Sequence, residues 1–196
     1  MYEIRLRKKE LRDKYSQLRR QLDASYKLRS DNKICDLVLS LASYRFAVAV
    51  LMYAPNPEEV NVMRIAEKAL SDGKTVAFPR CNKENTTMKY LIVTSLDQLE
   101  VGAYGLLEPP IDFPELAIGD GTSHALCIIP ALLYDKDGYR LGYGKGYYDR
   151  CLSQFKGTKL GVAYSGFVCD KVPRGRFDLS ADVLVTEKGV RSFYEG

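Results

Sequence analysis

Two short, continuous apolar runs limit most strongly what this chain can fold into. Residues 46–54 (FAVAVLMYA) and 125–130 (ALCIIP) contain no charged residue. A strand with one face in water alternates apolar and polar residues, whereas a strand that is covered on both faces is apolar throughout. Both segments therefore predict strands near the centre of a sheet that is covered on both sides.

Strand-like and helical segments alternate along the rest of the chain. Further short strands are predicted at 75–80, 87–93, 159–165 and 181–187. Helical patterns occupy 4–22, roughly 25–42, 58–74 and 144–155. This alternation predicts an open, Rossmann-like α/β fold with three layers (α/β/α), in which helices cover both faces of a mostly parallel sheet.

Length and composition predict one domain over residues 1–196. The chain is long enough to bury a core without disulfides or metal ions. Its five cysteines are odd in number and form no C-x-x-C pair, and it has one histidine, so we expect reduced core cysteines and no zinc site. Residues 95–124 form a long connection without a clear pattern, of the kind that is often functional.

The positive charge is concentrated in the first helical segment. The chain carries a net charge of +4, but residues 1–20 hold eight cations and three acids, so the remainder is slightly acidic. Ile4, Leu11 and Tyr15 share the apolar side of this helix, while Lys8 and Arg12 lie four residues apart on one face. Such a segment could meet nucleic acid, a membrane surface or a small phosphorylated ligand.

No stretch of the sequence resembles a membrane segment or a secretion signal. The longest apolar runs are far shorter than the roughly 18 residues of a membrane span, and the charged N-terminus lacks the apolar core of a signal peptide. We therefore expect a cytoplasmic protein without a membrane partner.

The segment 140–150 (RLGYGKGYYDR) is the strongest candidate for a functional site. It follows a buried strand, and ligands of open parallel sheets bind beyond the carboxyl ends of the strands. A glycine-rich turn that leads into a helix can bind phosphate through backbone N–H groups; Arg140 and Lys145 add charge, and Asp149 suits Mg²⁺. The alternative is a tight turn with packed tyrosines and a surface pair of Arg140 with Asp149. Composition does not separate the two readings.

The same segment, following IIPALLYDKDGY (128–139), resembles the signature of the 5-formyltetrahydrofolate cyclo-ligase family, also called methenyltetrahydrofolate synthetase. The resemblance covers nearly the whole chain. It includes Lys8-x-x-Leu11-Arg12 and then, in order, PEEVNV (57–62), FPR (78–80), GAYGLLEPP (102–110) and VPRGRFDLSADVLVTE (172–187).

The resemblance implies ATP-dependent cyclisation of 5-formyltetrahydrofolate to 5,10-methenyltetrahydrofolate, with release of ADP and phosphate and with Mg²⁺ as cofactor. It implies Lys145 and Arg140 as catalytic residues, and Asp149 and Asp178 as metal ligands. Asp182 is a nearby alternative to Asp178. The ATP-binding residues implied are Lys8, Arg12, Arg140, Leu141, Gly142, Tyr143, Gly144, Lys145, Gly146, Tyr147 and Tyr148.

The implied folate-binding residues are Glu59, Tyr104 and Tyr147. Glu59 has a second interpretation as a partner of the N-terminus of the helix that follows it. Arg80 is a further candidate for contact with phosphate or the folate tail.

Two other functions compete with this one. An enzyme could use the same ATP loop on a different acceptor, or a nucleic-acid-binding protein could use the basic first helix and the tyrosines of 143–148. The acidic remainder of the chain and Asp149 disfavour the second. We expect a monomer with small-molecule partners and no nucleic acid.

Overall fold

A seven-stranded, mostly parallel sheet forms the centre of the computed structural model, which describes residues 2–176 and 178–193. Five strands run parallel, and each edge strand is antiparallel to its neighbour. The strands, in spatial order, are β12 (Gly189–Ser192), β11 (Val183–Thr186), β9 (Thr158–Val162), β6 (Ala125–Ile129), β1 (Ala49–Leu51), β2 (Thr75–Asn82) and β3 (Thr87–Val93).

Both faces of this sheet are buried, as the apolar runs predicted. Neighbouring residues of one strand contribute to different cores: Val50 packs in one apolar cluster and Leu51 in another. On β2, Val76 and Ala77 divide in the same way. Because side chains alternate across a strand, a strand covered on both faces needs apolar residues at every position.

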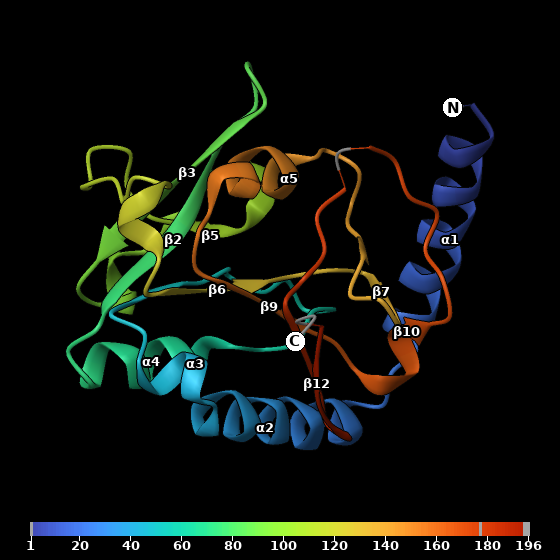
Figure 1. Cartoon of the computed structure of the whole chain (residues 1–196), viewed down its shortest axis with the longest axis horizontal. Coiled ribbons are helices and arrows are strands. Elements are labelled where there is room, and N and C mark those ends of the chain that lie inside the picture. Colours follow the sequence, from blue (N-terminus) through green and yellow to red (C-terminus); the bar gives the residue numbers. More distant parts are fainter. Residues whose placement is uncertain (1, 177, 194–196) are drawn as a thin grey trace.

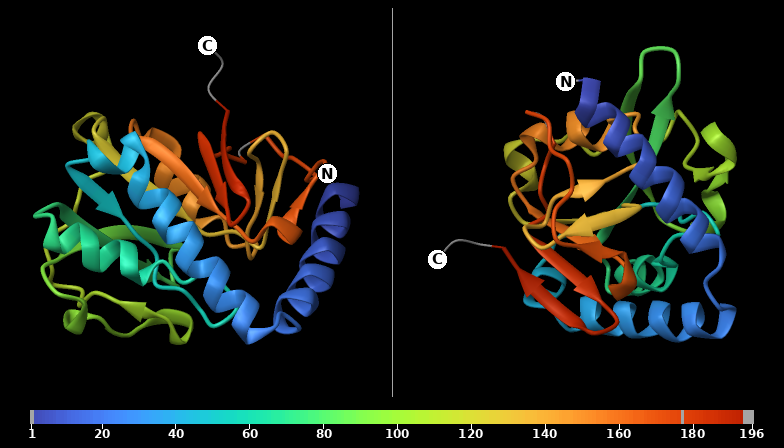
Figure 2. Two further views of the ribbon diagram at one scale, coloured as in Figure 1. Left: turned by 90° about the horizontal axis from the view of Figure 1, so that it is seen from below. Right: turned by 90° about the vertical axis from the view of Figure 1, so that its right-hand side faces the viewer.

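Helices form the two outer layers (Figures 1 and 2). One face is covered by α2, α3 and α4, and the other by α5 and the long connection, so the predicted three-layer α/β fold is confirmed. The helix α1 stands at one end of the molecule, beside a small second sheet (Figure 2). The helices are α1 (Tyr2–Arg20), α2 (Ala24–Ser40), α3 (Ala42–Arg45), α4 (Met63–Ser71) and α5 (Tyr147–Cys151).

The small sheet was not predicted. It pairs β7 with β10 in parallel and with β8 in antiparallel orientation. A further two-stranded ribbon lies within the long connection 95–124, which otherwise contains turns and 3₁₀ segments. Strands of two or three residues are too short to show a sequence period. These strands are β4 (Glu100–Val101), β5 (Leu107–Glu108), β7 (Leu133–Asp135), β8 (Arg140–Leu141) and β10 (Val168–Cys169).

Several predicted boundaries were too wide. The strand predicted for 46–54 is only Ala49–Leu51, because Phe46 and Val48 precede it at the exposed surface. The helix predicted for 58–74 begins at Met63, and 58–62 has neither helical nor strand structure. The 3₁₀ segments are η1 (Leu96–Gln98), η2 (Ala103–Gly105), η3 (Asp120–Thr122), η4 (Leu152–Gln154) and η5 (Ser165–Phe167).

The topology creates a crevice at one edge of the sheet. β1, β2 and β6 are parallel and end at the same edge. The chain leaves β1 for β2 on one side and later returns to β6 on the other side, so the strand order reverses between β1 and β6. Ligands of open α/β sheets bind at such a point, outside the carboxyl ends of the strands.

Candidate active site

A cleft of about 530 Å³ lies at this edge of the sheet. The segments after β1 and β6, the end of β2, the loop 104–108 and one face of α1 form its walls. Apart from the candidates Arg80 and Asp182, every residue to which the sequence analysis gave a role lines the cleft: Lys8, Arg12, Glu59, Tyr104, Arg140, Leu141, Gly142, Tyr143, Gly144, Lys145, Gly146, Tyr147, Tyr148, Asp149 and Asp178.

The glycines of the loop 140–150 make room for arginine side chains. A Cβ at Gly144 would lie 3.0 Å from the guanidinium carbon of Arg12, and one at Gly142 would lie 3.0 Å from Nη1 of Arg140. Gly144 also has a φ of +96°, which side chains rarely tolerate. The loop therefore needs glycine both for its conformation and for the close approach of the guanidinium groups.

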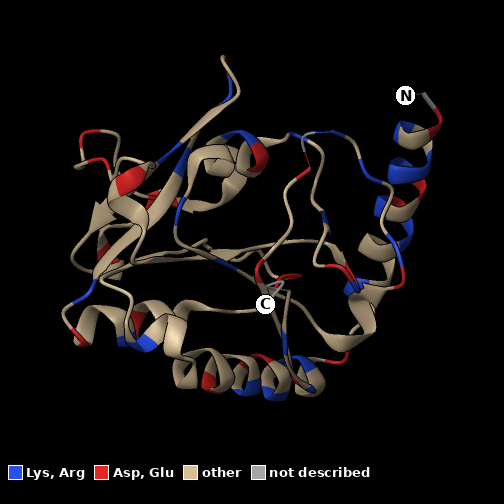
Figure 3. Ribbon diagram, in the orientation of Figure 1, with Lys and Arg blue, Asp and Glu red and all other residues tan. Residues whose placement is uncertain are grey.

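The basic face of α1 closes one side of the cleft. Nε of Arg12 donates to the carbonyl of Gly142 at 2.8 Å, and Nζ of Lys8 lies 2.5 Å from Oδ2 of Asp178. Burial lowers the pKa of Arg12, and the nearby carboxylate of Asp178 opposes that shift. Lys and Arg extend along α1 (Figure 3), but among its described side chains only these two line the cleft.

Arg140 and Asp149 form an ion pair inside the cleft rather than on the surface. Nη2 of Arg140 lies 2.7 Å from Oδ1 of Asp149, and the arginine side chain is 7% exposed. Its guanidinium carbon is 5.4 Å from the centre of the Tyr148 ring. The pair that the turn interpretation placed on the surface is therefore buried in the wall of the cleft.

Asp149 and Asp178 offer carboxylate oxygens to the same cleft. Among the described residues, the hydrogen bonds to Asp149 come from Arg140 and from the backbone of Leu179, and both end on Oδ1. Asp182 lies elsewhere, since it pairs with Lys159 at the start of β9. In the described part of the chain, no three His, Cys, Asp or Glu side chains are grouped closely enough to hold a metal ion by themselves.

Glu59 is buried, with 5% of its surface exposed, and its Oε2 accepts a hydrogen bond from the backbone N–H of Asn56 at 2.9 Å. Burial raises the pKa of the Glu59 carboxyl above its ordinary value near 4.5, and the Asn56 N–H opposes this shift. The alternative role at a helix N-terminus is wrong, because the next helix begins only at Met63, after Val62.

Tyr104 and Tyr147 meet at the opposite wall. Their hydroxyl oxygens are 2.9 Å apart, and their ring centres are 6.3 Å apart in an edge-to-face arrangement. The hydrogen bond between the two hydroxyls raises the pKa of Tyr147 to about 12, so the Tyr147 phenol remains neutral near physiological pH. Tyr143 lies on the other side, where its hydroxyl accepts a hydrogen bond from the Asn56 side chain at 3.0 Å.

Comparison with known proteins identifies the family. A sequence model described as "5-formyltetrahydrofolate cyclo-ligase family" matches residues 5–187. The chain belongs to the 5-formyltetrahydrofolate cyclo-ligase family. The resemblance drawn from the sequence is therefore confirmed.

Individual relatives match this cyclo-ligase family member over nearly its whole length. A Schizosaccharomyces pombe protein named "Probable 5-formyltetrahydrofolate cyclo-ligase" is 27% identical over 91% of this chain and 98% of its own length. The 5-formyltetrahydrofolate cyclo-ligase of Mus musculus is 27% identical over 92% of this chain and 93% of its own. The NMR structure of Aquifex aeolicus 5,10-methenyltetrahydrofolate synthetase matches with a TM-score of 0.84 at 34% identity, covering 96% of this chain and 94% of that one.

Other residues of the cleft in this cyclo-ligase family member were not predicted. The most notable is Glu108, which is buried with 4% exposure and packs against Gly102, where a Cβ would lie 2.3 Å from its Oε2. A glutamate within an apolar Leu-Leu-Glu-Pro stretch is the signal that could have indicated it. The unpredicted lining residues are Tyr53, Ala54, Asn56, Pro79, Cys81, Met88, Leu106, Leu107, Glu108 and Pro130.

Arg80 does not line the cleft. Its Nη1 donates to the Pro109 carbonyl at 2.6 Å and pairs with Glu100 at 2.8 Å. It therefore joins β2 to the segment that carries β4 and β5.

None of the helices in the described residues combines the length and apolar character needed to cross a lipid bilayer.

Proposed function

We propose that this protein is an ATP-dependent 5-formyltetrahydrofolate cyclo-ligase that forms 5,10-methenyltetrahydrofolate, ADP and phosphate. The observation that carries the proposal is the composition of the one cleft at the strand-order reversal. Cations of α1, a glycine loop, a buried carboxylate, Glu59, and two phenols all line this cleft. Such a cleft suits a phosphate-bearing substrate next to a ring with N–H donors.

The reaction needs activation of a poor electrophile, because the formyl carbonyl receives electron density from folate nitrogen 5. Transfer of the γ-phosphoryl group of ATP to the formyl oxygen releases ADP and makes that carbon reactive. Nitrogen 10 then bonds to the carbon and loses its proton, the carbon–oxygen bond breaks, and phosphate leaves. The protein has to align the two substrates and neutralise charge on the phosphoryl group.

In this scheme the cations of the loop and of α1 bind the nucleotide. Lys145 is exposed at the mouth of the cleft and contacts the γ-phosphate. Arg12 and Lys8 bind phosphate oxygens from the opposite side, with Arg12 oriented by its hydrogen bond to Gly142. Arg140, held by Asp149 and Tyr148, contributes a fixed positive charge near the transferring group.

Asp149 and Asp178 fit a magnesium site. Mg²⁺ binds proteins through one or two carboxylates and takes its other ligands from phosphate oxygens and water. When bound, Mg²⁺ supplies positive charge that neutralises the phosphates. In this structure Lys8 pairs with Asp178, and Arg140 pairs with Asp149.

The folate end of the cleft is formed by Glu59, Tyr104 and Tyr147. A carboxylate can accept two hydrogen bonds from the adjacent N–H groups of a pterin ring. The two tyrosine side chains, joined by their hydrogen bond, can line the side of the ring.

An absorbance assay for the methenyl product tests the proposal. We expect product to form from 5-formyltetrahydrofolate only when MgATP is present, with one ADP released for each methenyl group. Binding of MgATP without any response to 5-formyltetrahydrofolate would contradict the proposed acceptor and would favour an enzyme that uses the same ATP site on another substrate.

A further inference from the structure

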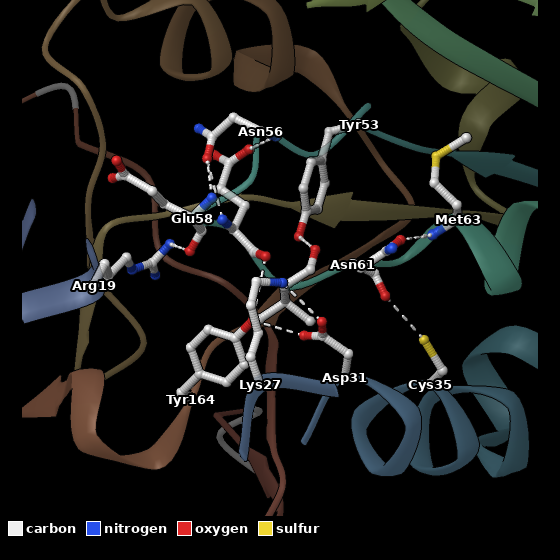
Figure 4. A network of polar contacts seen from close by, with 12 residues as sticks. Arg19, Lys27, Asp31, Cys35, Tyr53, Asn56, Glu58, Asn61, Met63 and Tyr164 are labelled. Atoms are coloured by element: carbon white, nitrogen blue, oxygen red, sulfur yellow. Dashed lines mark hydrogen bonds and ion pairs between the residues drawn. The ribbon is translucent and has the colours of Figure 1, made fainter. Parts of the chain in front are cut away.

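Four consecutive backbone carbonyls, those of residues 58–61, each accept a hydrogen bond from the side chain of a different part of the chain (Figure 4). This segment belongs to no helix or strand. The four donors, in the order of the carbonyls, are Arg19 at 3.4 Å, Tyr164 at 3.2 Å, Tyr53 at 2.7 Å and Cys35 at 3.4 Å. We call these four residues the carbonyl clamp.

The clamp residues come from four separate elements and are all buried. Arg19 is on α1, Cys35 on α2, Tyr53 follows β1 and Tyr164 follows β9. Backbone groups of buried loops require partners, and these partners are normally other backbone groups or water. Here side chains that converge from four directions supply them, so the position of 58–61 depends on the tertiary structure around it.

Tyr164 is itself held by a buried ion pair. Its hydroxyl donates to Oδ1 of Asp31 at 2.7 Å and, more weakly, to the Glu59 carbonyl. Oδ2 of Asp31 pairs with Nζ of Lys27 at 2.8 Å, one turn earlier on α2. Neither Tyr164 nor Asp31 lines the cleft, and the proposed reaction uses neither of them.

Arg19 connects residues 58–61, which follow β1, to the segment that follows β6. Besides the Glu58 carbonyl, its Nη2 donates to the carbonyl of Ala131 at 2.5 Å, directly after Pro130 in the cleft wall. Its guanidinium carbon lies 5.0 Å from the centre of the Phe167 ring. The arginine thereby ties the segment after β1 to the segment after β6.

We propose that the carbonyl clamp positions the carboxylate of Glu59 for the folate substrate, and that Tyr164 is a positioning residue of this enzyme. The inference rests on the proposed function, in which Glu59 binds the pterin ring. Residues 58–61 pair with none of the described strands, and the N–H groups of Glu58 and Glu59 bond locally to Asn56. Loss of one clamp donor therefore lets the carbonyl side of the Glu59 backbone move, while the nucleotide loop keeps its hydrogen bond with Arg12 of α1.

Tyr164→Phe tests this inference, because it removes one hydroxyl and retains the ring. The loss of one hydrogen bond should raise the KM for 5-formyltetrahydrofolate about five- to tenfold, with the KM for ATP and kcat changed less than twofold. Tyr44→Phe is the matched control. Tyr44 is also buried and also donates to an aspartate, Asp72, at 2.9 Å, but it is remote from the cleft.

A double-mutant cycle with Glu59→Gln determines whether Tyr164 acts through Glu59. If it does, Tyr164→Phe adds little to the KM for the folate once Glu59→Gln is present. Amide hydrogen exchange gives a readout independent of turnover: we expect faster exchange within 56–62 in Tyr164→Phe and not in Tyr44→Phe.

Three results overturn the inference. The first is that Tyr164→Phe changes the KM for the folate and the KM for ATP equally. The second is that the effects of Tyr164→Phe and Glu59→Gln are additive in the double-mutant cycle, and the third is that amide exchange within 56–62 is the same in Tyr164→Phe and in the Tyr44→Phe control. If the unmodified protein forms no methenyl product, the proposed function fails instead, and the role given to Tyr164 in folate binding fails with it.

Discussion

The two ends of the cleft are constructed in different ways. The phosphate end is largely one contiguous segment, 140–150, whose glycines admit Arg12 and Arg140. The Glu59 end consists of one buried carboxylate on a segment that side chains from four elements hold in place. At the first end most of the lining residues are close together in sequence, whereas at the second end the position of the carboxylate depends on contacts with distant parts of the chain.

Because of this difference, we expect mutations at the two ends to change different kinetic constants. In the proposed mechanism the cations at the phosphate end act on charge that develops during phosphoryl transfer, so their removal should lower kcat. The Glu59 end makes contacts that are the same before and during the reaction, so its loss should raise the KM for the folate. Kinetic constants for the two substrates can therefore test whether the division holds.

Lys145→Ala should have the largest effect. It removes the exposed cation of the loop that lines the cleft, and loss of one such stabilising group should lower kcat by about 10²–10³-fold with little change in the KM for the folate. Steady-state kinetics by methenyl absorbance measure both values. Lys156→Ala, an exposed lysine outside the cleft, is the control. An unchanged kcat in Lys145→Ala would remove the catalytic role given to this residue.

Glu59→Gln should follow in size. A hydrogen bond to a charged group contributes about 1.5–3 kcal/mol, so the KM for 5-formyltetrahydrofolate should rise about 10- to 100-fold. The KM for ATP should stay within about twofold, because the proposed ATP-binding residues do not include Glu59. Titration of the protein with each ligand measures whether the substitution weakens binding of the folate and not of ATP. Equal losses for the two ligands would mean that the ends of the cleft do not act separately.

Gly144→Ala tests the packing of Arg12 in the loop. The new methyl group would displace the guanidinium group that lies 3.0 Å from its position, so we expect the KM for ATP to rise about tenfold. Gly73→Ala is matched in backbone strain, since Gly73 has a φ of +71° with nothing within 4 Å of its Cβ position.

Both glycine variants should lose about 1–2 kcal/mol of unfolding free energy through left-handed strain, measured by urea denaturation. Only Gly144→Ala should raise the KM for ATP. If Gly73→Ala weakens ATP binding as much, the change reflects general destabilisation and not the contact with Arg12.

The smallest effect concerns stability and pH. The raised pKa of Glu59 means that the folded protein holds this proton more tightly than the unfolded chain does. The wild-type protein therefore loses stability as pH rises from near 4.5 through the folded pKa, whereas Glu59→Gln does not. The variant should gain unfolding free energy relative to wild type between pH 4 and pH 8, as thermal melts at several pH values would show. If the difference in unfolding free energy between the variant and the wild type is constant across that range, the folded protein does not raise the pKa of Glu59.

How much could be predicted from sequence depended on how local each feature is. The strand Thr87–Val93 was predicted with its observed bounds, because its β-rich pattern lies within seven residues. β7, β8 and β10 were missed, because strands of two or three residues show no period. The helix that follows Glu59 was predicted too long, because it begins only at Met63; Val60 and Val62 pack in the core from a segment with neither helical nor strand structure.

By itself, the sequence determined the sheet that is buried on both faces, the glycine loop after β6 and the cationic face of α1. Each of these depends on residues within a few positions of one another. Only the tertiary structure decided that Arg12 enters the loop 130 residues away, that Arg140 pairs with Asp149 inside the cleft, and that a clamp of side chains holds the Glu59 segment. The contacts of Arg12 and of the clamp join positions that only the topology brings together, so no spacing along the chain encodes them. The sequence did suggest that Arg140 pairs with Asp149, but not that the pair lies inside the cleft.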